Sequence, residues 1–313
     1  MMATLFLLVG YTAVGKTELS LRLAEALDAE ILSCDSVQVY RGMDIGSAKV
    51  SKLDRSRINH HGIDLVDVCD QFNIQRYIDY ASRVTEAVIR KGKNLLIVGG
   101  SGFYLKSFYG PILDDVVISD ELKAQVQSLY DNCGLVGLVN RIRELSGDSL
   151  AGLDLKNPRR VIKALERCLA TGTTLEQNIA RSEHWPWAFS NYKRATVLLK
   201  RNSGHELVRN RVIKMIEDGL VDEVKHLIKV GIENNRSAAN AIGYRETISF
   251  IKNGCIDCEN LINDIVKNTN NLVKKQRTWF KKQIPIDLEV CLDDYYVDES
   301  FDLVYMFFKK SVI

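Results

Sequence analysis

The sequence predicts an α/β protein, with a parallel sheet flanked by helices and a small helical domain inserted into the chain. Two observations predict this fold. In the first hundred residues, short apolar runs alternate with stretches whose apolar residues recur at helical spacing, which is typical of a parallel sheet covered by helices. Between residues 118 and 187 the strand signals stop while the helical spacing continues. We therefore expect a core domain of residues 1–117 and 188–313 and a helical insertion of residues 118–187.

The individual elements follow from the same patterns. Apolar runs predict strands at residues 4–9, 30–33, 94–98 and 195–199. Helical spacing predicts helices at residues 17–27, 74–91, 122–129, 138–145, 158–170, 206–230, 245–252 and 264–282. The acidic segment from Asp287 to Asp302 suggests neither an element nor a role.

Composition favours a globular protein of the cytoplasm. The 313 residues are 46% hydrophobic, and no apolar run approaches the roughly 20 residues of a membrane helix, so we expect no membrane partner. Seven scattered cysteines favour a reducing compartment over a disulfide framework. Cys255 and Cys258 form a C-x-x-C pair, but no second pair or nearby histidine completes a zinc site. We expect a monomer.

The net charge of +2 is unevenly distributed along the chain. Residues 1–150 carry 16 Lys and Arg against 19 Asp and Glu, residues 151–284 carry 24 against 14, and residues 285–313 carry 2 against 7. The three segments therefore have net charges of −3, +10 and −5. A basic block of this kind indicates nucleic-acid binding, although ordinary solvated helix faces explain it equally well.

Residues 10–17, Gly-Tyr-Thr-Ala-Val-Gly-Lys-Thr, form a P-loop motif. They fit G-x-x-x-x-G-K-[ST] between an apolar strand and an amphipathic helix, which predicts a P-loop NTPase-like core. In such a loop, backbone N–H groups and the helix N-terminus face one anion, a lysine adds charge and a hydroxyl reaches Mg²⁺. The residues expected to bind phosphate groups are Gly10, Thr12, Ala13, Val14, Gly15, Lys16 and Thr17, with Thr17 as the Mg²⁺ ligand.

Two further strand ends bear on the chemistry. The strand at residues 94–98 runs into Gly-Gly-Ser-Gly, where a nucleotide-hydrolysing switch would place a carboxylate, so we do not expect water to attack a γ-phosphate. Asp35 follows the second strand, which puts it at the carboxyl edge of the sheet beside the P-loop. An aspartate there could act as a base or cap the next helix, and the residue alone does not decide between them.

Several motifs occur in one order between residue 4 and about residue 282. After the P-loop come Asp-Ser-Val-Gln-Val-Tyr at 35–40, His-His-Gly-Ile-Asp at 60–64, Gly-Gly-Ser-Gly-Phe-Tyr at 99–104, Asn-Pro-Arg-Arg-Val-Ile-Lys-Ala-Leu-Glu at 157–166, Gly-Tyr-Arg-Glu at 243–246 and Lys-Lys-Gln-Arg-Thr-Trp-Phe at 274–280. In this combination the sequence resembles the bacterial tRNA dimethylallyltransferases.

The resemblance implies that a dimethylallyl group moves from dimethylallyl diphosphate to the N6 amine of the adenosine 3′-adjacent to the anticodon, with Mg²⁺ as cofactor. A P-loop suits this reaction because it stabilises the departing diphosphate while no nucleotide is consumed. Asp35 matches the family's general base, Ser101 a Thr or Ser that contacts the same region, and Arg211 an arginine that reaches the diphosphate. With Lys16, these are the expected catalytic residues.

The implied partner is the anticodon stem-loop of tRNA, whose target base must leave its stack. The residues expected to contact it are Asp35, Ser36, Val37, Gln38, Ser101, Lys123, Arg159, Arg160, Val161, Ile162, Lys163, Tyr244, Arg245, Lys274, Lys275, Gln276, Arg277 and Trp279. For Trp279, packing in the core is the alternative. Tyr11, Leu207, Asn240 and Asn270 depart from residues common in the family, which puts individual contacts in question.

Three other functions remain open at this point. A small-molecule kinase would share the P-loop and an aspartate after the second strand, but it would leave the basic block unexplained. A transferase that prenylates free adenine nucleotides would use the same P-loop and Asp35, although the long basic region favours tRNA. A non-catalytic RNA-binding module would have no need of Asp35.

Overall fold

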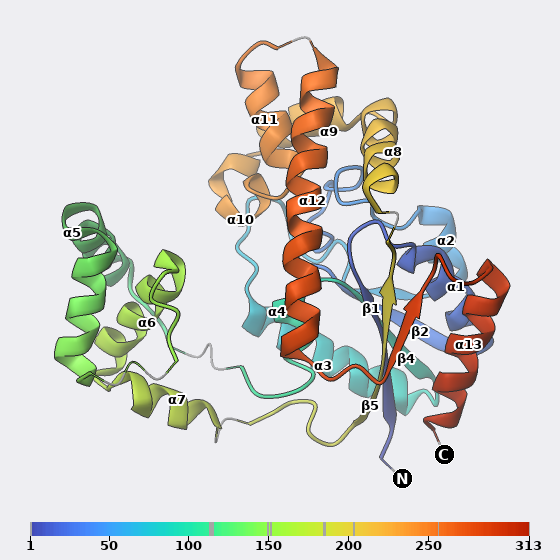
Figure 1. Cartoon of the computed structure of the whole chain (residues 1–313), viewed down its shortest axis with the longest axis horizontal. Helices are drawn as coiled ribbons and strands as arrows, with labels where there is room; N and C mark the ends of the chain where they lie inside the picture. Colours follow the sequence, from blue (N-terminus) through green and yellow to red (C-terminus); the bar gives the residue numbers. More distant parts are fainter. Residues whose placement is uncertain are drawn as a thin grey trace. The chain divides into compact units, whose positions relative to one another are not determined.

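In the computed structural model, the core of the protein is a 6-stranded sheet with strand order β3-β2-β4-β1-β5-β6 (Figure 1). All neighbouring strands pair in parallel, which confirms the expected fold class. The strands are β1 (Thr4–Gly10), β2 (Ala29–Cys34), β3 (His60–His61), β4 (Asn94–Gly99), β5 (Lys193–Lys200) and β6 (Leu288–Cys291). The structure describes residues 2–112, 116–148, 150, 152–183, 186–202, 204–255 and 257–312.

The chain divides into two compact units. The first comprises Met1–Tyr109 and Phe189–Ile313 and contains the sheet; the second, Gly110–Ala188, is helical. Helices of the first unit are α1 (Lys16–Ala26), α2 (Lys52–Arg57), α3 (Ile74–Arg90), α4 (Gly102–Lys106), α8 (Gly204–Glu217), α9 (Leu220–Lys229), α10 (Arg236–Ala239), α11 (Tyr244–Lys252), α12 (Cys258–Gln283) and α13 (Val297–Lys310), with a short 3-10 helix at Ile232–Asn234. No helix in the described ranges is long and apolar enough to cross a membrane.

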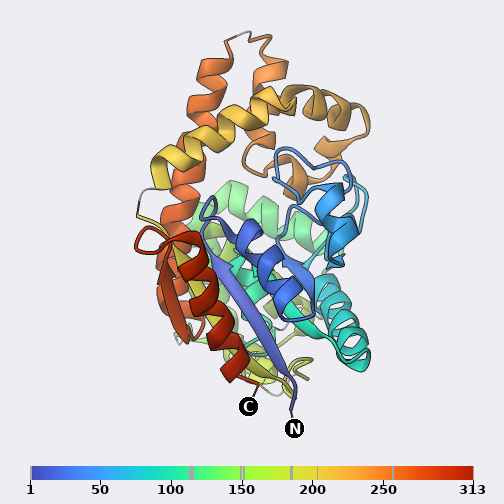
Figure 2. The ribbon, with the colours of Figure 1, turned by 90° about the vertical axis from the view of Figure 1, so that its right-hand side faces the viewer.

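The acidic C-terminal segment, for which the sequence suggested no element, is structured. It supplies β6, which extends the sheet beside β5, and α13, which lies alongside α1 (Figure 2). Phe308 is fully buried, and its ring stacks on that of Phe6 in β1 at 4.8 Å between centroids. The acidic side chains of α13 face solvent, so the segment closes the core by its apolar face and stays charged outside.

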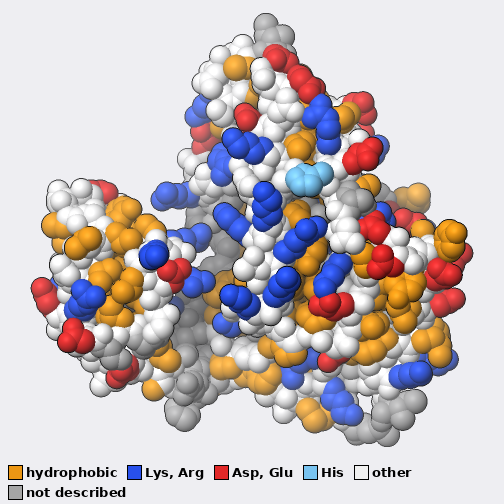
Figure 3. All heavy atoms as spheres, viewed as in Figure 1, with side chains coloured by type: hydrophobic (Ala, Val, Ile, Leu, Met, Phe, Trp, Pro, Cys, Tyr) orange, Lys and Arg blue, Asp and Glu red, His pale blue; other side chains and the backbone are white. Residues whose placement is uncertain are grey.

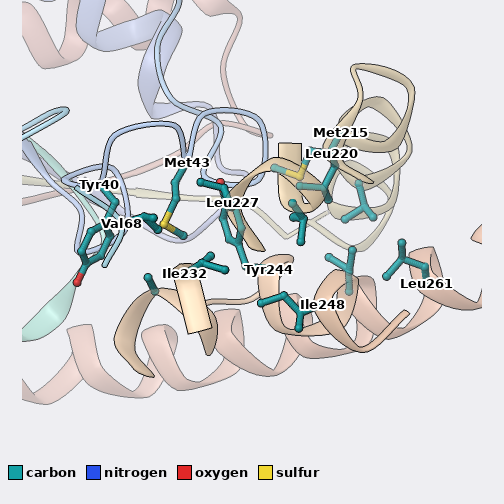
Figure 4. Packing of buried hydrophobic residues seen from close by; sticks show 14 of the residues in the cluster. Tyr40, Met43, Val68, Met215, Leu220, Leu227, Ile232, Tyr244, Ile248 and Leu261 are labelled. Atoms are coloured by element: carbon teal, nitrogen blue, oxygen red, sulfur yellow. The ribbon is translucent and has the colours of Figure 1, made fainter. Parts of the chain in front are cut away.

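A second hydrophobic core lies between the helices that follow β5 and the loop that follows β2. Buried side chains of α8, α9, α11 and α12 pack against Tyr40 and Met43 from the loop after β2 (Figure 4). The single helix expected over residues 206–230 is two helices, because Gly219 adopts a left-handed conformation (φ 100°) and begins α9. This core fixes the loop after β2 against the helical part of the first unit.

The second unit contains α5 (Asp120–Ser146), α6 (Pro158–Thr171) and α7 (Leu175–Glu183). Gly134 interrupts α5 with non-helical dihedrals (φ 62°, ψ −165°), which agrees with the two separate helices expected on either side of it. Leu138, Val161 and Leu165 are fully buried in a core that α5 and α6 share. The insertion therefore has a hydrophobic core of its own.

Candidate active site

Three loops meet at the carboxyl edge of the sheet. Gly99, the last residue of β4, pairs with Val9 of β1 on one side and with Cys34 of β2 on the other. The P-loop, the loop that begins at Asp35 and the loop that carries Ser101 therefore leave the sheet side by side. This is the edge at which parallel α/β sheets bind their ligands.

The P-loop runs from Gly10 to the start of α1. Ala13 (φ 63°) and Gly15 (φ 101°) both have positive φ, which turns the loop tightly into the helix. The ammonium of Lys16 donates hydrogen bonds to the carbonyls of Gly10 (3.0 Å) and Tyr11 (2.7 Å). Thr17 is exposed in the first turn of α1, where its hydroxyl is accessible to a ligand.

Three charged side chains interact around this loop. Burial, with a smaller effect of the nearby Arg211, lowers the pKa of Lys16 to about 7, although the Asp35 carboxylate opposes both effects. Burial also lowers the pKa of Arg211, on α8, and again Asp35 opposes the shift. No described residue accepts a hydrogen bond from the Arg211 guanidinium, so two cations and one carboxylate share the site without a fixed ion pair.

Asp35 is half-buried, and its two carboxylate oxygens differ. Oδ1 accepts hydrogen bonds from the backbone N–H groups of Val37 (2.8 Å) and Gln38 (3.4 Å), which caps the turn after β2. Oδ2 receives no hydrogen bond from any residue that the structure describes. Asp35 therefore caps a turn with one oxygen and keeps the other available, so the two roles considered from the sequence are compatible.

Ser101 lies next to Asp35. Its hydroxyl accepts a hydrogen bond from the Ser36 backbone N–H (3.0 Å) and donates one to the Ser36 hydroxyl (3.4 Å). Gln38 is held by a hydrogen bond from Ser33 to its side-chain oxygen (2.9 Å). Thus the serine expected from the sequence does contact the segment that carries the candidate base.

Helix α12 packs against the P-loop and against the loop that carries Ser101. The side-chain oxygen of Gln276 accepts a hydrogen bond from the Thr12 N–H (2.9 Å), and its nitrogen donates to the Gly100 carbonyl (3.1 Å). Arg277 donates to the Arg201 carbonyl (2.9 Å), whereas Lys274 and Lys275 are exposed. One face of this helix therefore supports the P-loop while another carries exposed cations.

Trp279 and two other expected tRNA contacts are at least partly enclosed. The half-buried Trp279 packs so closely on Gly102 that a Cβ there would lie 2.6 Å from its ring. Tyr244 is fully buried and donates to Glu223 (2.8 Å), while its neighbour Arg245 is exposed. Val161 is also fully buried, so it supports its helix rather than presenting a side chain.

The other residues expected to contact tRNA lie in the second unit. Arg159, Arg160 and Lys163 are exposed on α6, and Ile162 is half-buried there. Lys123, on α5, forms an ion pair with Asp120 (2.8 Å). Because these residues belong to a separate unit, they form a group distinct from the residues at the sheet edge.

Arg201 was missed by the sequence analysis. It follows β5, and its Nε donates to the Val14 carbonyl in the P-loop (3.3 Å). The signal was present, because Arg201 lies two residues beyond the strand predicted at 195–199, just as Asp35 lies two residues beyond the strand predicted at 30–33.

Comparison with known proteins decides the family. The family model described as IPP transferase matches residues 38–283, and the tRNA dimethylallyltransferase of Opitutus terrae is 46% identical over 280 residues, which cover 89% of this chain and 90% of that protein. The chain belongs to the IPP transferase family. This confirms the resemblance stated from the motifs.

Solved structures agree with membership of the IPP transferase family. The full-length tRNA isopentenylpyrophosphate transferase of Bacillus halodurans matches with a TM-score of 0.71 and 27% identity, covering 100% of this chain and 97% of that one. A eukaryotic dimethylallyltransferase acting on tRNA matches with a TM-score of 0.80 at 20% identity, covering 99% of this chain and 80% of that one, and this match supports the fold alone.

Proposed function

We propose that this protein transfers a dimethylallyl group from dimethylallyl diphosphate to the N6 amine of the adenosine 3′-adjacent to the anticodon of tRNA, releasing diphosphate. The observation that carries this proposal is the presence of one carboxylate, Asp35, next to the two cations Lys16 and Arg211 at a P-loop. Together they supply an anion site for a leaving group and a base beside it. Membership of the IPP transferase family supports the same reaction.

The anion site acts on the departing diphosphate. As the bond from C1 of the dimethylallyl group to oxygen breaks, positive charge grows on carbon and negative charge on the diphosphate. Lys16, Arg211 and the N–H groups from Ala13 to Thr17 bind that negative charge at the start of α1. Because these groups are fixed before the reaction, they stabilise the charge without reorganising.

The acceptor is an aryl amine, which is too weakly acidic to lose its proton in advance. Its acidity rises as the bond from N6 to C1 forms, and the free Oδ2 of Asp35 then takes the proton. Ser101, which is bonded to Ser36, holds the Asp35 loop in place. A base used in this way typically contributes about 10²–10⁴-fold to the rate.

Mg²⁺ fits the donor groups at this site. In phosphate sites, Mg²⁺ takes one or two protein ligands together with phosphate oxygens and water. The exposed hydroxyl of Thr17 supplies such a ligand, and no cluster of three His, Cys, Asp or Glu that could hold a metal alone occurs in the described ranges. When bound, Mg²⁺ would neutralise part of the diphosphate charge.

Two sets of cations are proposed to bind the anticodon stem-loop. In the first unit, Lys and Arg side chains gather over α12 (Figure 3). The basic face of α12 consists of the exposed residues Lys274, Lys275, Arg277, Lys281 and Lys282. Arg245 adds to this set in the first unit, and Arg159, Arg160, Lys163 and Lys123 form the second set in the insertion. We further propose that the protein is a cytoplasmic monomer.

One assay tests the proposal against its alternatives. Labelled dimethylallyl diphosphate is incubated with the enzyme and Mg²⁺ and with tRNA, with AMP, with ATP labelled at its γ-phosphate or with no acceptor. We expect label only in tRNA, at the adenosine beside the anticodon. Label in AMP alone would indicate a free-nucleotide transferase, transfer of the γ-phosphate from ATP would indicate a kinase, and either result would refute the proposal.

A further inference from the structure

Gln276 was expected to contact tRNA, but its side chain is hydrogen-bonded to two loops of the protein itself. Its side-chain amide bridges the P-loop and the loop after β4, through Thr12 N–H at 2.9 Å and the Gly100 carbonyl at 3.1 Å. We propose that Gln276 is a positioning residue that sets the P-loop relative to the loop carrying Ser101. This inference rests on the proposed transferase function.

The chemistry of the bridge requires an amide. One partner, Thr12 N–H, is a donor and the other, the Gly100 carbonyl, is an acceptor, so only a group with an acceptor and a donor at this spacing satisfies both. Asparagine is one methylene shorter, and a carboxylate would face the Gly100 carbonyl without a proton to donate. Gln276 is therefore matched to its two partners in both length and polarity.

Neighbouring contacts hold Gln276 in place. At helical spacing, Trp279 and Phe280 lie on the same side of α12 as Gln276. Phe280 is 1% exposed and contacts the Tyr11 ring at 6.0 Å between centroids. A Cβ at Gly100 would lie 2.9 Å from the Gln276 nitrogen, so the bridge depends on a glycine there. This side of α12 is packed against the loops and leaves the amide little freedom.

The two loops that Gln276 bridges serve different events of the proposed reaction, the departure of the diphosphate and the removal of the proton from the amine. Thr12 belongs to the loop that binds the diphosphate, whereas Gly100 precedes Ser101, whose hydroxyl bonds to Ser36 beside Asp35. The distance between the leaving oxygen of the diphosphate and the base, Asp35, matters in the transition state and much less for binding of either substrate. A displacement of about 1 Å between reacting groups costs on the order of 10²-fold in rate. Loss of the bridge should therefore lower kcat more than it alters binding.

The first test is Gln276→Met, which keeps the length of the side chain and removes both hydrogen bonds. We expect kcat to fall by roughly 10–100-fold while KM for dimethylallyl diphosphate and Kd for tRNA change by less than about threefold. The matched control is Thr278→Ala on the same helix, whose hydroxyl donates to the Lys274 carbonyl (3.2 Å) and, among the residues that the structure describes, to neither loop; its kcat should stay at the wild-type value. If Gln276→Met raises KM for tRNA and leaves kcat unchanged, Gln276 is a tRNA contact and the inference is wrong.

The second test is a pH profile of Gln276→Glu. The ionised carboxyl accepts from Thr12 but has no proton for Gly100, whereas the protonated carboxyl restores both hydrogen bonds. Activity relative to the wild type should therefore rise as the pH falls from 8 to about 5, near the range in which a glutamate titrates. A constant ratio would overturn the inference. Wild-type activity is measured in parallel, so failure of the transferase proposal would appear there and not in the ratio.

Discussion

The low pKa of Lys16 makes binding of the prenyl donor dependent on pH. In the free protein its pKa is about 7, because burial and Arg211 disfavour the ammonium more than Asp35 favours it. A bound diphosphate favours the ammonium and should return the pKa toward its ordinary value of 10.5. Above pH 7, donor binding should therefore take up a proton, and affinity should fall as the pH rises.

The size of the effect follows from linkage. With a free-state pKa of about 7, roughly 0.9 of the Lys16 side chains are neutral at pH 8, so binding takes up about 0.9 proton. The affinity should fall roughly fiftyfold between pH 7 and 9. The donor contributes little to this slope, because the last ionisation of a phosphate monoester lies near pH 6.

Calorimetric titration of dimethylallyl diphosphate without tRNA measures both quantities. Titrations at several pH values give the fall in affinity as the pH rises. The dependence of the binding heat on the ionisation enthalpy of the buffer gives the number of protons that binding takes up. Lys16→Arg is the matched variant, since a guanidinium stays charged throughout and should give a flat profile. Wild-type affinity that is constant from pH 7 to 9, with no proton uptake, would refute the reasoning.

Other variants test the base, the insertion and the C-terminal helix. Asp35→Asn retains an acceptor for its turn, so tRNA affinity should persist while single-turnover rate falls by at least about 10²-fold; an unchanged rate would remove Asp35 from the mechanism. Neutralising Arg159 and Arg160 should reduce the slope of log K for tRNA against log salt by about one to two units, and an unaltered slope would contradict their assignment. Phe308→Ala should lower the free energy of unfolding in urea by about 3–5 kcal/mol, and Met306→Ala, at an exposed site, by far less; equal losses would argue against α13 as part of the core.

Local patterns were sufficient for the centre of the fold. Strands β1, β2, β4 and β5 each contain a largely buried run in which apolar residues predominate, because a parallel sheet covered on both faces needs such strands. The P-loop was predictable because its motif encodes a backbone shape. Gly15, for example, adopts φ 101° at the point where α1 begins, a conformation that favours glycine.

Two elements at the edges of the first unit were not predicted, for different reasons. The strand β3 has only two residues, His60 and His61, and exists because β2 offers an edge to pair with. The helix α13 was missed because its acidic residues dominate the composition, although Phe301, Val304 and Phe308 recur at helical spacing. That spacing was the usable signal, and net charge obscured it.

The helical geometry of α12 explains why the sequence did not suggest the role that we propose for Gln276. A motif read as a linear string joins Lys274, Lys275 and Gln276 into one basic run, yet a helix separates them. Taking 100° per residue, Gln276 falls with the aromatic residues Trp279 and Phe280, and Lys274 falls on the opposite side. One turn of α12 can therefore hold the P-loop from one side and offer cations to an anticodon stem-loop from the other. If both proposals hold, tRNA bound to the basic face of α12 lies one helix diameter from the amide that aligns the leaving group with its base.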